Sequence, residues 1–174
     1  ADLATPLECV PEFVSIIDSG KEVVLGSRVK LLGRKIQRRA VRHYLGRVFA
    51  TFVSVILRLP VYDTQCGAKL FRRTAALEAA MSMPFRVKWT FDVELLGRLS
   101  MLEEASGRAG CQDAWVEFPL PSWEDVRGSK VRAADFIRSG FELLRLMSFF
   151  HVGAVRKKYL RDLLAKSGKS AFTR

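Results

Sequence analysis

The sequence has little of what a disulfide-linked, zinc-binding or membrane-spanning protein needs. Its three cysteines, Cys9, Cys66 and Cys111, lie far apart and form no CxxC pair. They therefore indicate neither a disulfide framework nor a zinc site, and they favour a reducing cytoplasm. The start of the chain shows no secretory signal pattern. The longest run without a charged residue or histidine, Val48–Leu57, is about half of the ~20 residues that a membrane-crossing helix needs.

Acidic residues are missing from a long part of the first half of the chain. No carboxylate lies between Glu22 and Asp63, although this part carries many cations. The net charge of +11 and the pI near 10.1 indicate an anionic partner, such as nucleic acid, an acidic membrane surface or a phosphorylated substrate. No basic motif with interleaved aromatic residues is present, so no nucleic-acid partner is expected. A basic module that binds nucleic acid or a membrane surface is nevertheless the alternative function that the charge leaves open. The cations of this part are Arg28, Lys30, Arg34, Lys35, Arg38, Arg39, Arg42, Arg47 and Arg58.

Composition and short-range pattern predict a globular α/β protein. The 174 residues are 49% hydrophobic and 27% charged, which suits one domain with a buried core. The apolar run Val23–Leu25, bounded by Gly26, predicts a buried strand. In a parallel sheet this strand would carry Gly26, Ser27 and Arg28 to its carboxyl end, where α/β folds place their ligands.

Helical periodicity and chain breakers predict the other elements. Apolar residues at i, i+3 and i+4 mark the segment from Val41 to Leu59 as the strongest amphipathic helix. A helix over Val131–Phe150 is predicted to face one apolar stripe inward, formed by Ala134, Ile137, Phe141, Leu144 and Met147. The remaining predicted elements are helices over Pro11–Asp18, Thr74–Met81 and Phe91–Glu104 and a strand over Ala114–Phe118.

The last segment, His151–Arg174, is basic and carries its apolar residues on one side of a helix. Two interpretations stay open from this pattern. The segment is an interfacial helix on an anionic membrane, or it docks on its own domain or on a partner subunit. The sequence shows no internal repeat and no second domain. The apolar residues concerned are Val155, Tyr159, Leu160, Leu163 and Leu164.

The stretch Val61–Phe71 concentrates the features of a site for an anionic substrate. It follows Pro60 and places the first acid after the basic part close to Gly67, which permits tight backbone geometry. Its core, Asp-Thr-Gln-Cys-Gly-Ala-Lys-Leu-Phe from Asp63, resembles the signature of dolichyl-phosphate glucosyltransferase-like enzymes of glycosyltransferase family 2, with Ala68 in place of the usual Phe. Four further blocks agree in order and spacing: Ala1–Pro6, Gly26–Arg28, Trp89–Leu96 and Gly128–Lys130.

The resemblance covers about Ala1 to Leu146 and implies an α/β fold, the C-terminal portion of a GT-A glycosyltransferase. It implies a catalytic part over residues 1–150, a basic tail over 151–174 and a nucleotide-binding half upstream. The implied reaction is the inverting transfer of a hexose, glucose above all, from a nucleotide-diphosphate sugar to a polyprenyl phosphate. The implied location is the cytoplasmic face of a membrane, and this piece alone is expected to be inactive.

The resemblance also implies roles for two acidic residues. Asp63 falls on the catalytic carboxylate, as a base or as an orienting acid, whereas the bland alternative is an Asx turn before Thr64. Asp2 falls on the second carboxylate of an acidic pair that holds Mg²⁺ or Mn²⁺, both of which prefer carboxylate oxygen. The alternative for Asp2 is an ordinary residue near the end of the chain, without a role in the site. Weak or absent metal binding is expected here, because the pair is incomplete.

Three cations and one further acid complete the implied site. Arg28, Arg42 and Lys130 fall on positions that bind substrate phosphates, and arginine suits this because its planar fork grips two oxygens. A solvated basic helix face is the alternative for the arginines, and helix capping by Ser129 is the alternative for the Gly-Ser-Lys block. Asp92 is expected on the acceptor side of the site.

Overall fold

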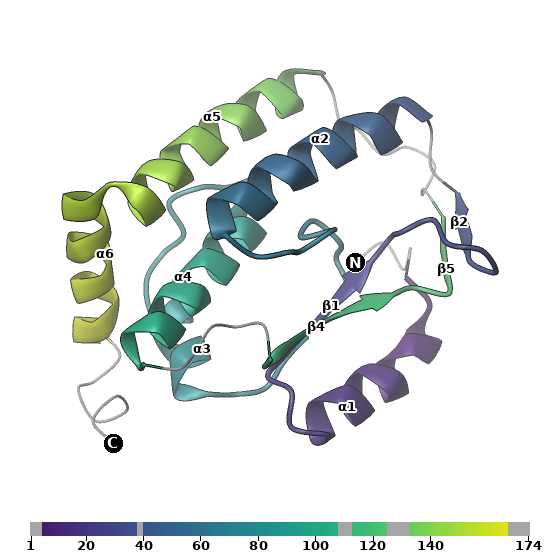
Figure 1. Ribbon diagram of the computed structural model, residues 1–174, viewed down its shortest axis with the longest axis horizontal. Helices are drawn as coiled ribbons and strands as arrows, with labels where there is room; N and C mark the ends of the chain where they lie inside the picture. Colours follow the sequence, from purple (N-terminus) through teal and green to yellow (C-terminus); the bar gives the residue numbers. More distant parts are fainter. Residues whose placement is uncertain (1–4, 38–39, 108–112, 125–132, 167–174) are drawn as a thin grey trace. The chain divides into compact units, whose positions relative to one another are not determined.

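The computed structural model describes residues 5–37, 40–107, 113–124 and 133–166, and it confirms a mixed α/β fold (Figure 1). Contacts divide the chain into two compact units. Unit 1 comprises Ala1–Val55, Pro60–Arg72 and Gln112–Val131. Unit 2 comprises Ile56–Leu59, Arg73–Cys111 and Arg132–Arg174. The chain therefore passes between the units several times, and residues distant in sequence share a unit.

Unit 1 is built on a sheet with β1 (Val23–Ser27) at its centre. β1 pairs antiparallel with β3 (Lys69–Phe71) and parallel with β4 (Trp115–Pro119). The predicted strands near Val23 and Ala114 are thus confirmed, and their parallel pairing places Ser27 beside Pro119 at the carboxyl end. A second sheet pairs β2 (Lys35–Gln37) with β5 (Ser122–Glu124), in two segments for which no strand was predicted. Strands of three residues are too short to show an alternating pattern.

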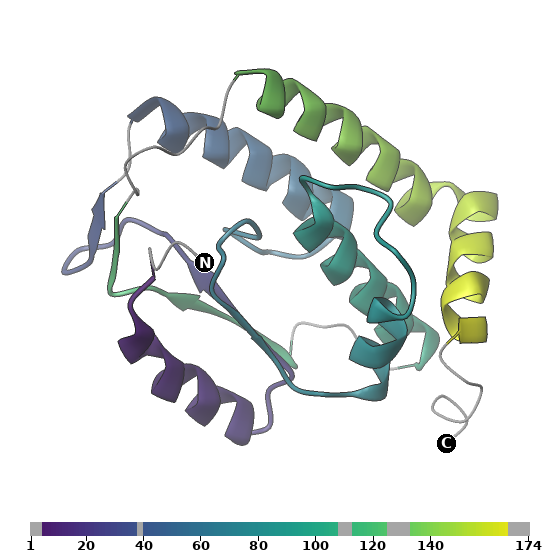
Figure 2. The same cartoon turned by 180° about the vertical axis from the view of Figure 1, so that it is seen from behind.

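The core of unit 1 lies between the sheet and α1 (Val10–Asp18). This helix follows the short 3₁₀ helix η1 (Leu7–Cys9) and runs beside the strands (Figure 2). The predicted helix ending at Asp18 is confirmed. Gly26 lets the Cys66–Ala68 loop approach β1, because a Cβ at this position would lie 2.9 Å from the Ala68 carbonyl oxygen. The buried core residues are Cys9, Phe13, Val24, Ile36, Cys66 and Leu120.

The long amphipathic helix is confirmed as α2 (Ala40–Leu57). Its apolar residues do not share one environment. Val53 is buried, whereas Val48, Phe52 and Val55 each expose more than half of their surface. The residue after the helix end, Arg58, has φ of 52°, a left-handed conformation that ends the helical turn.

Unit 2 is helical, with α3 (Ala75–Met81), α4 (Phe91–Ala105), α5 (Ala133–His151) and α6 (Gly153–Lys166). Thr74 caps α3, since its hydroxyl accepts the Leu77 N–H at 3.2 Å. α4 is the most buried helix of this unit, and at Gly97 it packs so tightly that a Cβ there would lie 2.2 Å from the Phe150 ring. The predicted helices over this part of the chain are confirmed.

The prediction that the Ile137 stripe of α5 faces inward is wrong. Ile137 is 64% exposed, Phe141 69%, Leu144 59% and Met147 45%. The buried face carries Leu143, Leu146 and Phe150 instead (the side chain of Ala134 lies outside the described residues). Both faces of α5 are apolar, so periodicity alone could not select the one that packs.

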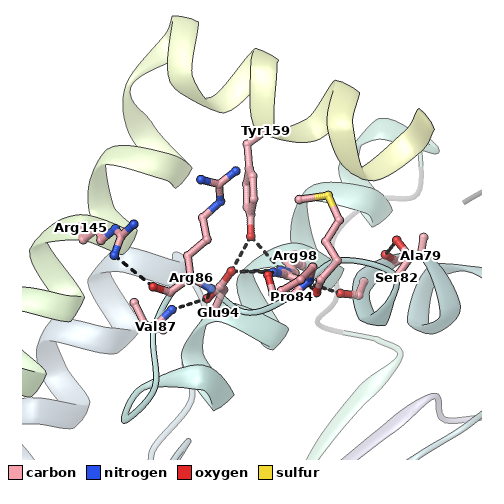
Figure 3. Close-up of polar contacts among 11 residues, drawn as sticks. Ala79, Ser82, Pro84, Arg86, Val87, Glu94, Arg98, Arg145 and Tyr159 are labelled. Atoms are coloured by element: carbon pink, nitrogen blue, oxygen red, sulfur yellow. Dashed lines mark hydrogen bonds and ion pairs between the residues drawn. The ribbon is translucent and has the colours of Figure 1, made fainter. Parts of the chain in front are cut away.

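The tail helix α6 packs on its own unit, as the second interpretation of the basic tail expects, and contact of the tail with a membrane stays a prediction. Tyr159 and Leu163 are buried, and the Tyr159 hydroxyl donates to Glu94 on α4 at 2.6 Å (Figure 3). The division at residue 150 stays a prediction, although α6 here belongs to the same unit as α5. Over the part of the chain that the structure describes, every helix is too short or too polar to cross a membrane.

Candidate functional site

The candidate site lies in unit 1, where β1 ends and the Val61–Phe71 stretch folds back on it. Arg28 directly follows β1 and donates through Nε to Asp63 Oδ2 at 2.6 Å and through Nη2 to Oδ1 at 2.7 Å. The Arg28 backbone N–H also donates to Asp63 Oδ2 at 3.1 Å. This is a bidentate, charge-assisted pair, and it is largely shielded from water, with side-chain exposures of 15% and 8%.

A second carboxylate fixes the backbone of the same segment. Glu117, in the middle of β4, accepts the N–H of Tyr62 at 2.8 Å and that of Asp63 at 2.7 Å. The sequence analysis did not single out Glu117. The available signal was weak: Glu117 is the single charged residue of the strand Trp115–Pro119.

Two arginines of this site lie over aromatic rings. The Arg28 guanidinium lies 5.2 Å from the centre of the Trp123 ring, and the Arg47 guanidinium lies 4.2 Å from that of Tyr62. Both distances suit cation–π contact. Trp123 comes from β5, so the short second sheet contributes to the surroundings of Arg28.

Buried polar atoms without a hydrogen-bond partner cluster in sequence around the pair. They are Ser27 Oγ, Thr64 Oγ1 and Gln65 Nε2, as far as the described residues show. Ser27 precedes Arg28 and Thr64 follows Asp63, and both residues are at most 2% exposed. Buried polar atoms usually have a hydrogen-bond partner. These three lie close to Arg28 or Asp63 in sequence.

Cys66 takes no nucleophilic part in this arrangement. Its burial raises the pKa of the thiol, and the neighbouring charge of Asp63 raises this pKa further. The side chain is fully buried against the Gly26 backbone. These surroundings are those of a small packing residue, because a reactive thiol needs a lowered pKa.

The other predicted site residues fall elsewhere. Asp2 and Lys130 lie outside the described residues, and so does the side chain of Arg42. Asp92 lies in unit 2, in the first turn of α4. Of the predicted residues, the structure thus brings Arg28 and Asp63 together. Within the described ranges no three His, Cys, Asp or Glu side chains are grouped as a metal site would require.

The segment before Asp92 is also held by a carboxylate, as the segment before Asp63 is. Glu142 on α5 accepts the N–H groups of Lys88, Trp89 and Thr90 at 2.9–3.2 Å, together with the Thr90 hydroxyl. Burial by itself would raise the pKa of Glu142, but the bonds from Thr90, Lys88 and Trp89 outweigh it and lower this pKa. The side chain of Trp89 stays about half exposed.

The sequence is similar to those of several glycosyltransferases. A dolichyl-phosphate β-glucosyltransferase of Trichomonas vaginalis is 30% identical over 88% of this chain and 44% of its own length. The dolichyl-phosphate β-glucosyltransferase of Saccharomyces cerevisiae is 31% identical over 77% of this chain and 38% of its own. The glycosyltransferase AglD of Haloferax volcanii is 33% identical over 83% of this chain and 22% of its own.

The chain therefore spans less than half the length of these relatives. No family model matches it, and no solved structure matches it. The similarity confirms the resemblance that the Asp-Thr-Gln-Cys-Gly block and its companion blocks indicated.

Proposed function

Because this chain is a relative of the dolichyl-phosphate β-glucosyltransferases, we propose that it is part of an enzyme that transfers glucose from a nucleotide-diphosphate sugar to a polyprenyl phosphate, with inversion at the sugar carbon. The observation that carries this proposal is the Arg28–Asp63 pair. It forms at the carboxyl end of β1 from two of the blocks that carry the resemblance. A parallel strand end is where α/β folds place ligands.

Asp63 best serves this reaction by orienting a reactant. Three hydrogen bonds from Arg28 already hold its two oxygens. A lipid phosphate has a second pKa of about 6, so near neutral pH it is mostly an anion that attacks without losing a proton. A strong base is therefore unnecessary, whereas a carboxylate in a fixed place is useful for aligning the acceptor or the sugar.

The phosphate-binding roles of Arg28, Arg42 and Lys130 belong to the same proposal. Arg28 meets the requirement for a planar donor at the strand end, and its pairing with Asp63 couples phosphate binding to the position of the carboxylate. A donor diphosphate competes with Asp63 for the guanidinium. Asp92 serves the acceptor side, next to the exposed Trp89.

The divalent cation, Mg²⁺ or Mn²⁺, stays part of the proposal through Asp2. When bound, it neutralises the diphosphate of the donor. The described residues offer no further cluster of ligands for it, and no other step of this proposal depends on the cation. The remainder of the enzyme is proposed to supply most donor contacts, so this piece alone is expected to be inactive.

An anionic membrane surface is a further proposed partner, at the cytoplasmic face. The exposed stripe of α5 gives it a better contact than the tail, because Ile137, Phe141 and Leu144 are all more than half exposed. Arg138 and Arg145 are exposed on the same helix, and arginines beside an apolar stripe suit anionic headgroups.

The test of the proposed function uses the whole enzyme with UDP-glucose or GDP-mannose, Mg²⁺ and a polyprenyl phosphate. Transfer from UDP-glucose is expected, and Asp63→Asn is expected to reduce transfer to a low but measurable residual rate while donor binding survives. Asp113→Asn, an exposed acid of the same unit, is the matched control and keeps wild-type transfer. A folded wild-type enzyme that uses neither donor would contradict the proposal.

A further inference from the structure

We propose that Glu117 is a positioning residue for Asp63: its carboxylate fixes the backbone from which the catalytic carboxylate projects. This inference rests on the proposed role of Asp63. It concerns a residue that no sequence motif indicated. The claim is that Glu117 acts on the reaction through Asp63 and touches no reactant.

The hydrogen-bond geometry carries the first step. Glu117 Oε2 accepts the N–H of Tyr62 at 2.8 Å, and Oε1 accepts the N–H of Asp63 at 2.7 Å. Two bonds from one carboxylate to consecutive amides fix the orientation of the peptide group that joins Tyr62 to Asp63. This peptide plane immediately precedes the Asp63 side chain, so its orientation decides where the Asp63 carboxylate points.

The second step is that both anchors of Asp63 stand on one rigid support. Arg28 follows β1 and holds the Asp63 side chain, whereas Glu117 lies in β4 and holds the backbone. β1 and β4 pair in parallel, with Leu25 opposite Glu117. Strand-borne groups hold a site more accurately than loop-borne groups. The loop carrying Asp63 is therefore fixed by two adjacent strands.

The third step explains why the residue is a glutamate. Glu117 is part-buried in β4, and each of its two oxygens accepts one N–H of the loop. A glutamine has only one acceptor oxygen, and its NH₂ group is a donor that neither N–H can use. A carboxylate thus offers each of the two amides an acceptor oxygen of its own. The charge in the strand is thus accounted for by the loop that it holds.

The decisive experiment is a double-mutant cycle in the whole enzyme. Glu117→Gln is expected to lower kcat about 10²-fold with little change in the donor KM, the size associated with a reacting group displaced by about 1 Å. In an Asp63→Asn background, Glu117→Gln is expected to cause no further loss. An undiminished, independent loss in that background would overturn the proposal. Glu117→Asp, which keeps the charge, is expected to restore part of kcat.

A second measurement does not depend on the reaction. Hydrogen exchange of the Tyr62 and Asp63 amides is expected to be faster in Glu117→Gln than in the wild-type enzyme. Glu124→Gln, an exposed carboxylate at the end of β5, is the matched control and leaves this exchange unchanged. Unchanged exchange in Glu117→Gln overturns the proposal whatever the enzyme transfers. Absent transfer by the wild-type enzyme would instead contradict the proposed function.

Discussion

The two units each contain an arginine–carboxylate pair, and the pairs differ in how completely the protein surrounds them. In unit 2, Glu94 and Arg98 are both 0% exposed. Arg98 also donates to the carbonyls of Ala80, Met83 and Pro84 (Figure 3). In unit 1, the Arg28–Asp63 pair retains some exposure and has buried polar atoms without partners beside it in sequence.

Complete burial indicates a structural role for the pair in unit 2, whereas the partial exposure of the Arg28–Asp63 pair suits the role proposed for it. The Glu94–Arg98 pair joins α4 to the segment before it and, through Tyr159, to α6. Burial raises the pKa of Tyr159, and its bond to Glu94 raises this pKa further, so the hydroxyl stays a proton donor. A ligand has no access to such a pair. The Arg28–Asp63 pair is also shielded from water, which strengthens its electrostatic contacts. It differs from the Glu94–Arg98 pair because it lies at the end of a strand and keeps some exposure.

The largest expected effect comes from breaking the buried pair. Arg98→Met leaves Glu94 charged and buried without its cation, and we expect a loss of about 3–5 kcal/mol in the free energy of unfolding. Denaturant unfolding followed by circular dichroism measures this loss. A loss below about 1 kcal/mol would mean that water reaches Glu94 and that the pair is not structural.

Arg28→Lys sharpens the comparison of the two pairs, because it keeps the charge and removes the planar guanidinium that binds both Asp63 oxygens. We expect transfer by the whole enzyme to fall at least about 10-fold, since lysine cannot bind both Asp63 oxygens in the same way, while the free energy of unfolding changes by about 1 kcal/mol. Arg98→Lys is the matched variant and should reverse this order, losing stability first. Equal losses of stability in the two variants would contradict the distinction.

The pH dependence of stability tests Glu142, whose carboxylate holds the segment before Asp92. The pKa of Glu142 is lower in the folded protein than its ordinary value of 4.5. The unfolded chain therefore binds the proton more readily, and the stabilisation is complete above the unfolded pKa and lost as the pH falls through the folded one. Unfolding midpoints between about pH 3 and 6 should show a shallower pH dependence for Glu142→Gln than for the wild type. Parallel curves would refute this.

The smallest effect is expected from the exposed pair of Arg73 and Glu78, whose side chains are 87% and 58% exposed. Arg73→Ala should change the free energy of unfolding by no more than about 0.5 kcal/mol, because water screens the pair and both side chains lose entropy when they meet. A thermal or denaturant melt checks it. A loss near that of Arg98→Met would show that burial does not govern these pairs.

Local signals predicted the elements of the fold well. The strand at Val23, the cap at Thr74 and the helix from Phe91 all rest on interactions within a few residues. The wrong prediction concerned the Ile137 face of α5, because a helix with two apolar faces needs its neighbours to decide which one packs. β2 and β5 were missed because three residues carry too short a pattern.

The sequence by itself determined most of the helices, the strands at Val23 and Ala114 and the position of Asp63 in a recognisable block. Only the tertiary structure decided which groups hold Asp63. Arg28 lies 35 residues and Glu117 54 residues from it in sequence. No local pattern links residues so far apart. Their contact arises because β1 and β4 pair in parallel and bring a strand end and a strand-borne carboxylate to the same loop.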